Sequence, residues 1–229
     1  MRLVEHIMGL PISLEIPSPE PARAAFDWLR EVDRRFSPFR PDSEVCLGAS
    51  SQEMTEILAL CEEYERRSGG AFRSRLPGRP FDPCGVVKGW AVERAAQLLR
   101  DQGVREFCLN AGGDVVAAGR TWSVGIRHPD HAHEVCAVFE VRDQAVATSG
   151  TYERGEHIVD GRTGRPVRDL VSLTVVAPDL TTADAVSTAA FAMGEEGIGW
   201  AAAQPDCLVF AVDARRRVRK SEALTRMTR

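Results

Sequence analysis

The chain contains almost no lysine. Of its 29 basic residues only two, Lys88 and Lys220, are lysines, and the other 27 are arginines. A function that depends on a lysine therefore has few candidate residues. An excess of positive charge is also missing, because 33 acidic residues give a net charge of −4. This balance argues against a dedicated nucleic-acid binder.

Long hydrophobic runs are missing as well, and the N-terminal segment does not have the pattern expected of a signal peptide. No apolar stretch approaches the roughly 20 residues that cross a bilayer. Near the N-terminus, Glu5, His6 and three prolines interrupt the segment, so it has no continuous apolar region of a signal peptide and no visible lipobox. We therefore expect a cytoplasmic protein without a membrane span.

The cysteines lack the spacing of a metal or disulfide framework. No C-x-x-C pair is present, and the six residues are widely separated in a chain that is long for a disulfide scaffold. We expect reduced, mostly buried thiols. The six are Cys46, Cys61, Cys84, Cys108, Cys136 and Cys207.

The remaining composition is typical of a soluble globular protein, with 44% hydrophobic and 27% charged residues in 229. A chain of this length buries roughly 70–75% of its unfolded surface, which is enough for a substantial core. Neither an internal repeat nor an interdomain linker is visible. We expect a single domain over residues 1–229.

The order of the expected elements favours an α+β fold. Antiparallel strands are grouped in the middle of the chain, with helices before and after them, which predicts antiparallel sheets with packed helices. Helices are expected at 20–36, 51–67, about 87–102, 181–193 and 195–203. Strands are expected at 3–16 (interrupted near Gly9), 107–110, 115–118, 122–127, 134–141, 145–148, 156–160, 171–177 and 207–213.

Residues that end helices can also be predicted. We expect Ser50 to cap the helix at 51–67, with Glu53 as its capping-box partner and Gly69 just past its end. The helix at 181–193 is expected to begin at a Thr181 or Thr182 cap.

The helix at 181–193 carries a possible metal site. Asp184 and Thr188 are four residues apart and share one face, with Ser187 beside them. A carboxylate, a hydroxyl and nearby backbone carbonyls suit a hard cation such as Mg²⁺. The alternative is that the carboxylate caps the helix and the threonine bonds back to the preceding turn.

The segment DPCGVVKGWAVERAA leads into a helix. Gly85 and Gly89 allow close backbone approach, and a helix N-terminus favours an anion. We expect Lys88 in the first turn, where a lysine is unfavourable for the helix dipole and is better explained by a bound phosphate. The segment lacks the P-loop pattern. The alternative is a solvated lysine on a surface turn.

Three further segments have weaker signals. The glycine turn of NAGGDVVA lets the backbone approach a ligand or simply a neighbouring strand. His157 could be a general base near neutral pH, or an edge-strand histidine without a role. The segment HPDHAH is expected to be an exposed loop rather than a metal cluster, and the basic run 215–220 a solvated turn or edge strand.

The order of these segments resembles the ApbE family, the FAD:protein FMN transferases. The resemblance extends from about Met8 to Gly194. It rests on nine blocks that occur in the family order: HIMGLPISLEI, FSPFRPDSEV, GGAF, DPCGVVKGWAVERAAQLL, LNAGGDVVAAG, WSVGIRHP, AVATSG, HIVDGRTGRP and VSLTVVAPDLTTADAVSTAAFAMG.

The resemblance implies an ApbE-like, T-fold-like architecture and a magnesium-dependent reaction. FAD would be split at its pyrophosphate, FMN attached through its phosphate to a threonine or serine of an acceptor flavoprotein, and AMP released. Two alternatives stay open. One is an FAD pyrophosphatase that yields free FMN and AMP, and the other is a protein that binds FAD without turnover.

The resemblance also assigns roles by position. His157 would be the catalytic base, and Lys88 would face the flavin phosphates. The metal ligands would be Asp184, Thr188 and Ser187 with the backbone carbonyl of Gly85. The other residues of the flavin site would be Met8, Phe39, Ala71, Phe72, Asp82 and Val159.

The chain departs from the family pattern at several of these places. Arg73 replaces an acid after Gly-Ala-Phe, and Gly161 replaces a proline. Phe72 and Asp82 are only ten residues apart, where the family has some tens of residues. We therefore expect a more open adenine side. An acid often stands at the position of Ser187, and a tyrosine at that of Phe39.

Overall fold

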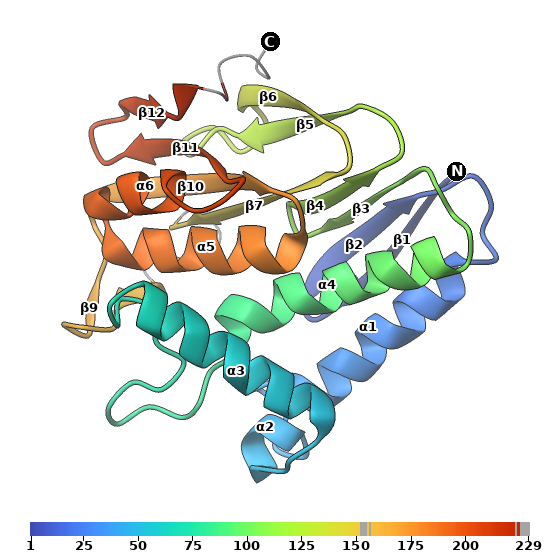
Figure 1. Ribbon diagram of the computed structural model, residues 1–229, viewed down its shortest axis with the longest axis horizontal. Coiled ribbons are helices and arrows are strands. Elements are labelled where there is room, and N and C mark those ends of the chain that lie inside the picture. The colour runs from blue at the N-terminus through green and yellow to red at the C-terminus, as the bar shows by residue number, and fades with distance from the viewer. Residues whose placement is uncertain (152–154, 156, 223, 225–229) are drawn as a thin grey trace.

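The computed structural model describes residues 1–151, 155, 157–222 and 224. Its centre is an eight-stranded sheet in which neighbouring strands are antiparallel (Figure 1). In spatial order the strands are β1 (Arg2–Ile7), β2 (Leu10–Glu15), β3 (Phe107–Ala111), β4 (Asp114–Ala118), β7 (Gln144–Gly150), β10 (Leu170–Ala177), β11 (Leu208–Asp213) and β12 (Val218–Lys220).

Helices cover one face of this sheet (Figure 1). They are α1 (Ala22–Phe36), α2 (Glu44–Leu47), α3 (Gln52–Arg67), α4 (Cys84–Asp101), α5 (Leu180–Met193) and α6 (Glu195–Ala202). The main core lies between these helices and the sheet, and α4 and α5 contribute many of its buried residues. Within it, Trp90 of α4 packs edge-on against Trp28 and Phe36 of α1. The α+β fold is therefore confirmed.

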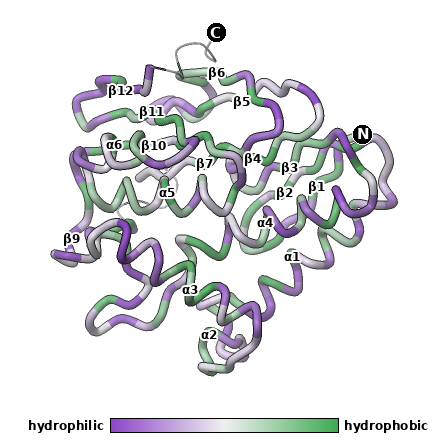
Figure 2. Tube along the Cα trace, viewed as in Figure 1, coloured by the Kyte–Doolittle hydropathy of each residue, from purple (hydrophilic) through white to green (hydrophobic). Residues whose placement is uncertain are grey.

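A two-stranded ribbon covers the other face of the sheet. It pairs β5 (Trp122–Arg127) with β6 (Val135–Val141) and encloses a second, smaller core. Phe139 of the ribbon meets Phe210 of β11 with ring centroids 5.7 Å apart. Figure 2 shows hydrophobic residues along the middle strands of the sheet and hydrophilic ones along β12. A short pair, β8 (Val159–Asp160) and β9 (Arg165–Pro166), lies apart from the main sheet.

Element positions agree well with the sequence predictions, but several helix ends differ. The cap of α3 is Ser51, not Ser50, because its hydroxyl accepts from the Met54 amide. The cap of α5 is Asp179, whose carboxylate accepts from the Thr182 amide, so the threonine cap was wrong. Helix α4 begins at Cys84, three residues earlier than predicted.

Two further predictions can be compared with the structure. Lys220 lies on the exposed edge strand β12, as expected for the basic run. None of the six cysteines forms a disulfide, but only Cys61 and Cys207 are buried and Cys46 is exposed, so most thiols are less buried than predicted. No helix in the described part of the chain is long and apolar enough to cross a membrane.

Candidate functional site

Lys88 of α4 lies between two buried carboxylates. Its Nζ is 2.5 Å from Asp114 Oδ2 and 3.3 Å from Asp184 Oδ1. Because α4 begins at Cys84, the lysine lies in the second helical turn rather than the first. Its side chain is half-buried, so it is not the solvated surface lysine considered as an alternative. The helix dipole does not explain its position either. The two acids therefore bind the lysine ammonium from two sides of the site, Asp114 from β4 and Asp184 from α5.

Asp114 reaches this point from a tight turn. Gly112 and Gly113 both have positive φ, at 62° and 104°, which is the backbone conformation of a two-residue hairpin turn. The turn joins β3 to β4 and leaves Asp114 as the first residue of β4, only 2% exposed. Its Oδ1 accepts a hydrogen bond from the Thr148 amide of β7 at 3.0 Å. The glycine turn therefore brings a carboxylate, not only backbone, to the site.

Asp184 is held by the close packing of α4 against α5. Its Oδ2 accepts from the Gly89 amide at 2.8 Å, the donor that a regular helix gives to the carbonyl of Gly85. A Cβ at Gly89 would lie 2.6 Å from Asp184 Cβ and 2.6 Å from the Leu180 oxygen. Glycine is therefore required for the two helices to meet here. Asp184 is not an N-terminal cap of its own helix, because Asp179 has that role.

The charges in this cluster perturb one another. Burial raises the pKa of Asp184 to about 6, Asp114 acts in the same direction, and Lys88 opposes both. Burial alone would lower the pKa of Lys88, but the two carboxylates raise it above its usual value. Lys88 therefore remains an ammonium, and the three side chains carry a net charge of −1 when both acids are ionised.

Four of the predicted residues, Phe72, Gly85, Ser187 and Thr188, lie beside this cluster. A Cβ at Gly85 would lie 2.6 Å from the Phe72 ring and 3.0 Å from Thr188 Cγ2. Thr188 Oγ1 is 3.3 Å from Ser149 Oγ of β7. The buried Ser187 hydroxyl lies 3.0 Å from the same Ser149 oxygen and donates to the Asp184 carbonyl. Ser187 already has two partners, so Thr188 is the more available hydroxyl.

The donors gathered here are oxygens of several kinds. They are the carboxylate of Asp184, the Thr188 hydroxyl and the backbone of Gly85, whose usual amide partner is engaged by Asp184. In the described part of the chain, no group of three or more His, Cys, Asp or Glu side chains forms a metal site. Such a small, oxygen-only donor set suits Mg²⁺, which keeps waters and substrate phosphates in its shell.

The residue that follows β8, Gly161, contacts the residues just after α3. The Gly161 amide donates to the Ala71 oxygen at 2.7 Å. A Cβ at Gly161 would lie 2.6 Å from the Gly70 oxygen and 2.7 Å from Arg73 Cγ. Two of the departures from the family pattern, Arg73 and Gly161, are thus in contact with each other. This contact places Ala71 beside the segment that contains Val159.

The structure shows no contact that ties the other predicted residues to Lys88 among those described. Met8 lies in the β1–β2 turn with φ of 55° and packs on the main core. Phe39 is 81% exposed in the loop before α2. Asp82 is exposed and accepts from the Cys84 amide at the start of α4. His157 is exposed, and its Nδ1 lies 3.0 Å from the Gly155 oxygen.

The sequence did not point to two residues of the site, Asp114 in the cluster and Ser149 beside it. Asp114 and Ser149 both come from blocks that support the family resemblance, LNAGGD and AVATSG. Asp114 follows the glycine pair directly, but nothing in its spacing indicates a contact with Lys88. The register of the sheet brings Asp114 and Thr148 together, because Val115 of β4 is paired with Val146 of β7.

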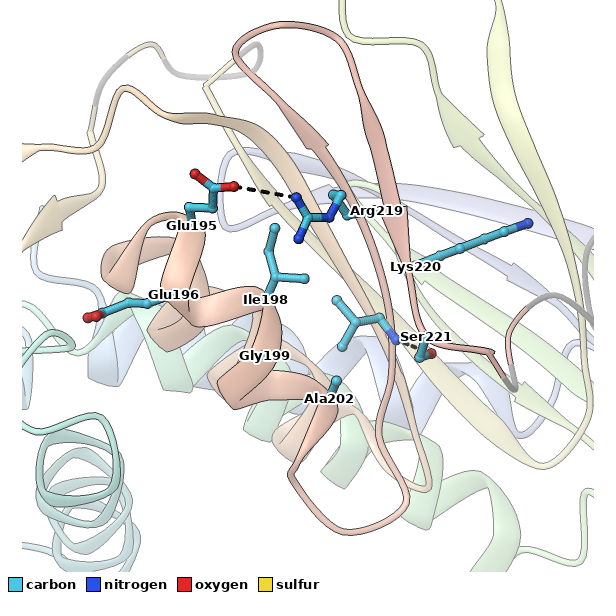
Figure 3. A pocket seen from close by; sticks show the side chains of 9 residues that line it. Glu195, Glu196, Ile198, Gly199, Ala202, Arg219, Lys220 and Ser221 are labelled. Carbon is cyan, nitrogen blue, oxygen red and sulfur yellow. Dashed lines mark hydrogen bonds and ion pairs between the residues drawn. The ribbon is translucent and has the colours of Figure 1, made fainter.

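A shallow groove of about 390 Å³ lies elsewhere, between α6 and the β11–β12 hairpin (Figure 3). Glu195 and Arg219 form an ion pair at 3.4 Å across its end. Glu196 and Lys220 also line it. The sequence-predicted site residues lie outside its walls, so the groove gives no support to a flavin site.

Comparison with known proteins gives concordant results. The model of the ApbE family matches residues 73–210. An FAD:protein FMN transferase of Vibrio cholerae is 30% identical over 174 residues, which are 69% of this chain and 52% of that protein. One of Rhodobacter capsulatus is 34% identical over 182 residues, 74% of this chain and 33% of that protein. The matches thus span about half or less of these relatives.

Solved structures share the fold over the whole chain. The flavin transferase ApbE from Vibrio cholerae has a TM-score of 0.84 at 22% identity and covers 99% of this chain and 98% of its own. The ApbE protein from Thermotoga maritima has a TM-score of 0.86 at 24% identity, covering 100% and 99%. At this identity the likeness establishes the architecture that the sequence predicted.

Proposed function

Since this chain belongs to the ApbE family, we propose that it is a magnesium-dependent FMN transferase. It cleaves FAD, attaches FMN through a phosphoester bond to a threonine or serine of an acceptor flavoprotein, and releases AMP. The observation that supports this most strongly is the position of Lys88, an ammonium held by Asp114 and Asp184 beside Thr188 and Gly85. The proposal treats residues 1–229 as one domain, since both cores share one sheet.

The donor set fits the proposed cation. Asp184, Thr188 and the carbonyl of Gly85 would hold Mg²⁺, with Ser187 supporting them through its hydrogen bonds. A net charge of −1 in the cluster favours a divalent cation over an empty buried site. Bound Mg²⁺ would supply charge neutralisation at the phosphate oxygens. Few protein ligands are needed, because the pyrophosphate of FAD brings oxygens of its own.

Lys88 would bind the phosphates with the N–H that its carboxylate partners leave available, since an ammonium has three donors. Its charge remains fixed because the two acids keep its pKa high. The lysine therefore stabilises negative charge that develops on the phosphate during transfer. We place the pyrophosphate over the second turn of α4 on this basis.

The flavin would lie between separate segments of the chain. Phe39 is a large exposed aromatic side chain, and stacking on the flavin rings would bury it. Met8 would contact the rings from the β1–β2 turn. Ala71, Phe72 and Val159 would line the other side, where Gly161 joins the two segments. Asp82 would line the flavin site from the Asp82–Pro83 pair that precedes α4.

His157 would take the proton of the acceptor hydroxyl. The hydroxyl oxygen attacks the FMN-side phosphorus, the bond from that phosphorus to the bridging oxygen breaks, and AMP leaves with that oxygen. The exposure of His157 suits a base that must meet a hydroxyl on another protein. The acceptor flavoprotein is thus the partner that completes the site.

The test is incubation with FAD, Mg²⁺ and candidate acceptor proteins, with in-gel flavin fluorescence and AMP measured together. Native chain should label an acceptor and release equal amounts of AMP. Lys88→Met should lose both products, whereas Lys220→Met, which removes the other lysine, should keep both. AMP release with free FMN as the only flavin product would refute transfer and support pyrophosphatase activity. FAD binding without AMP would refute both activities.

A further inference from the structure

Asp114 is a buried carboxylate whose only part in the proposed reaction, so far, is to keep the Lys88 ammonium charged. It is 2% exposed, and the backbone holds it on one side, since its Oδ1 accepts from the Thr148 amide. The β3–β4 turn fixes the backbone of Asp114, which is the first residue of β4. Its remaining oxygen, Oδ2, lies 2.5 Å from Lys88 Nζ. Groups other than Lys88 therefore hold the Asp114 side chain in place.

The two distances from Lys88 are unequal. Its Nζ lies 0.8 Å closer to Asp114 Oδ2 than to Asp184 Oδ1, from 2.5 Å and 3.3 Å. Asp184 Oδ2 is already committed to the Gly89 amide, so Oδ1 is the oxygen that a cation would take. Lys88 and a divalent cation therefore compete for the same oxygen. Whatever holds the ammonium toward Asp114 reduces that competition.

We propose that Asp114 is a positioning residue that holds the Lys88 ammonium so that Asp184 Oδ1 stays available to a divalent cation. Without the Asp114 charge, Lys88 would form its full ion pair with Asp184 and exclude the metal. Asp114 thus acts through Lys88 and does not touch the cation. The inference rests on the proposed function in taking Asp184 as the cation's carboxylate ligand.

The test is a Mn²⁺ titration of the full chain without FAD, with free Mn²⁺ followed by its electron paramagnetic resonance signal. The titration is done with and without inorganic pyrophosphate, which stands for the phosphates of the substrate. Asp114→Asn keeps the shape of the side chain and removes its charge. The variant chain should bind Mn²⁺ at least about tenfold more weakly, as expected when a residue that orients a metal site without touching the metal is changed. Lys88→Met should bind Mn²⁺ at least as tightly as the native chain.

The decisive variant combines the two changes. If Asp114 acts through Lys88, then Asp114→Asn should cost much less Mn²⁺ affinity in the Lys88→Met background than in the native one. An equal loss in both backgrounds would show a direct effect of charge and would overturn the inference. If Asp114→Asn alone is too unstable to study, Lys88→Met can be compared directly with the double variant. A tenfold loss of Mn²⁺ affinity in the double variant relative to Lys88→Met also overturns the inference.

Two variants serve as matched controls. Asp213→Asn removes a carboxylate that is equally buried, at 4% exposed, and ion-paired with Arg217. Lys220→Met removes the other lysine. Both should leave Mn²⁺ affinity unchanged, and a tenfold loss in either would overturn the assignment. A native chain that binds no Mn²⁺ in either condition would overturn it too. A chain that shows the expected metal pattern but transfers no FMN would refute only the proposed activity.

Discussion

A methyl group added at Gly89 has no room between α4 and α5. The variant Gly89→Ala therefore tests the close packing of these two helices, which positions Asp184. The new Cβ would lie 2.6 Å from the Leu180 oxygen and 2.6 Å from Asp184 Cβ. Ordinary contacts between such atoms are well above 3 Å. The Leu180 oxygen belongs to the backbone of α5, so no side-chain rotation can relieve the overlap. The helices must separate.

Two opposing effects determine the size of the change. Alanine in a helix interior is favoured over glycine by about 1 kcal/mol. Forcing extra atoms into a packed interior costs about 1–3 kcal/mol. Because the obstacle is backbone, we expect the upper part of that range and a net loss of about 1–2 kcal/mol in the free energy of unfolding. For a domain of this size, this lowers the melting temperature by about 2–8 °C.

Gly199→Ala is the matched control. Gly199 is also a helix residue, in α6, but a Cβ there would have nothing within 4 Å. Only the helix propensity then changes, so this variant should be more stable by about 0.5–1 kcal/mol. The measurement is thermal unfolding by circular dichroism of the two variants and the native chain, followed by FMN transfer.

The two readouts should agree. Separation of α4 from α5 moves Asp184 away from the Gly89 amide and from Lys88, so Gly89→Ala should also lose most of the proposed transfer activity. Gly199→Ala should keep full activity. If Gly89→Ala melts at or above the melting temperature of the native chain, the close contact between α4 and α5 does not exist in solution. The geometry of the proposed cation site, which depends on that contact, is then refuted as well.

Three further predictions follow from individual contacts. Gly161→Ala places a Cβ 2.6 Å from the Gly70 oxygen, and we expect the KM for FAD to rise more than kcat falls; steady-state kinetics with an unchanged KM would contradict this. Thr188→Val removes a hydroxyl almost isosterically and should weaken Mn²⁺ binding at least about tenfold in a titration, with little change in melting temperature; native-like affinity would exclude Thr188 as a ligand. Iodoacetamide at pH 8 should label the exposed Cys46 and spare Cys61, because burial raises the pKa of the Cys61 thiol to about 11 and keeps it protonated; peptide mapping that finds Cys61 labelled in the folded chain would contradict this.

Much of the architecture is predictable because apolar spacing determines it locally. The helix expected at 20–36 forms as α1, and its regularly spaced apolar residues Ala25, Phe26, Leu29, Val32 and Phe36 are all buried. The ends of helices are less predictable, because several polar residues compete to cap each one. Ser50 and Ser51 are adjacent and chemically identical, and only the backbone geometry selects the second.

The candidate site is predictable only where its residues share an element. Asp184 and Thr188 lie on one face of α5 because they are four residues apart, and the sequence alone shows this. The link from Lys88 to Asp114 depends on how α4 packs over the sheet and on the register of β4 and β7, which no local pattern contains. The same holds for Ser149, which reaches Thr188 from a different strand.

The scarcity of lysine has a practical consequence for experiments on this protein. The Lys88 amine is held in two ion pairs and its pKa is raised, so amine-reactive reagents should leave it unmodified. Lys220 is exposed on β12, four strands from β4 in the sheet, or roughly 19 Å at the usual strand spacing. Apart from the N-terminus, a dye or a solid support would attach at one defined position. Oriented immobilisation or single-site fluorescence labelling is therefore possible without any mutation.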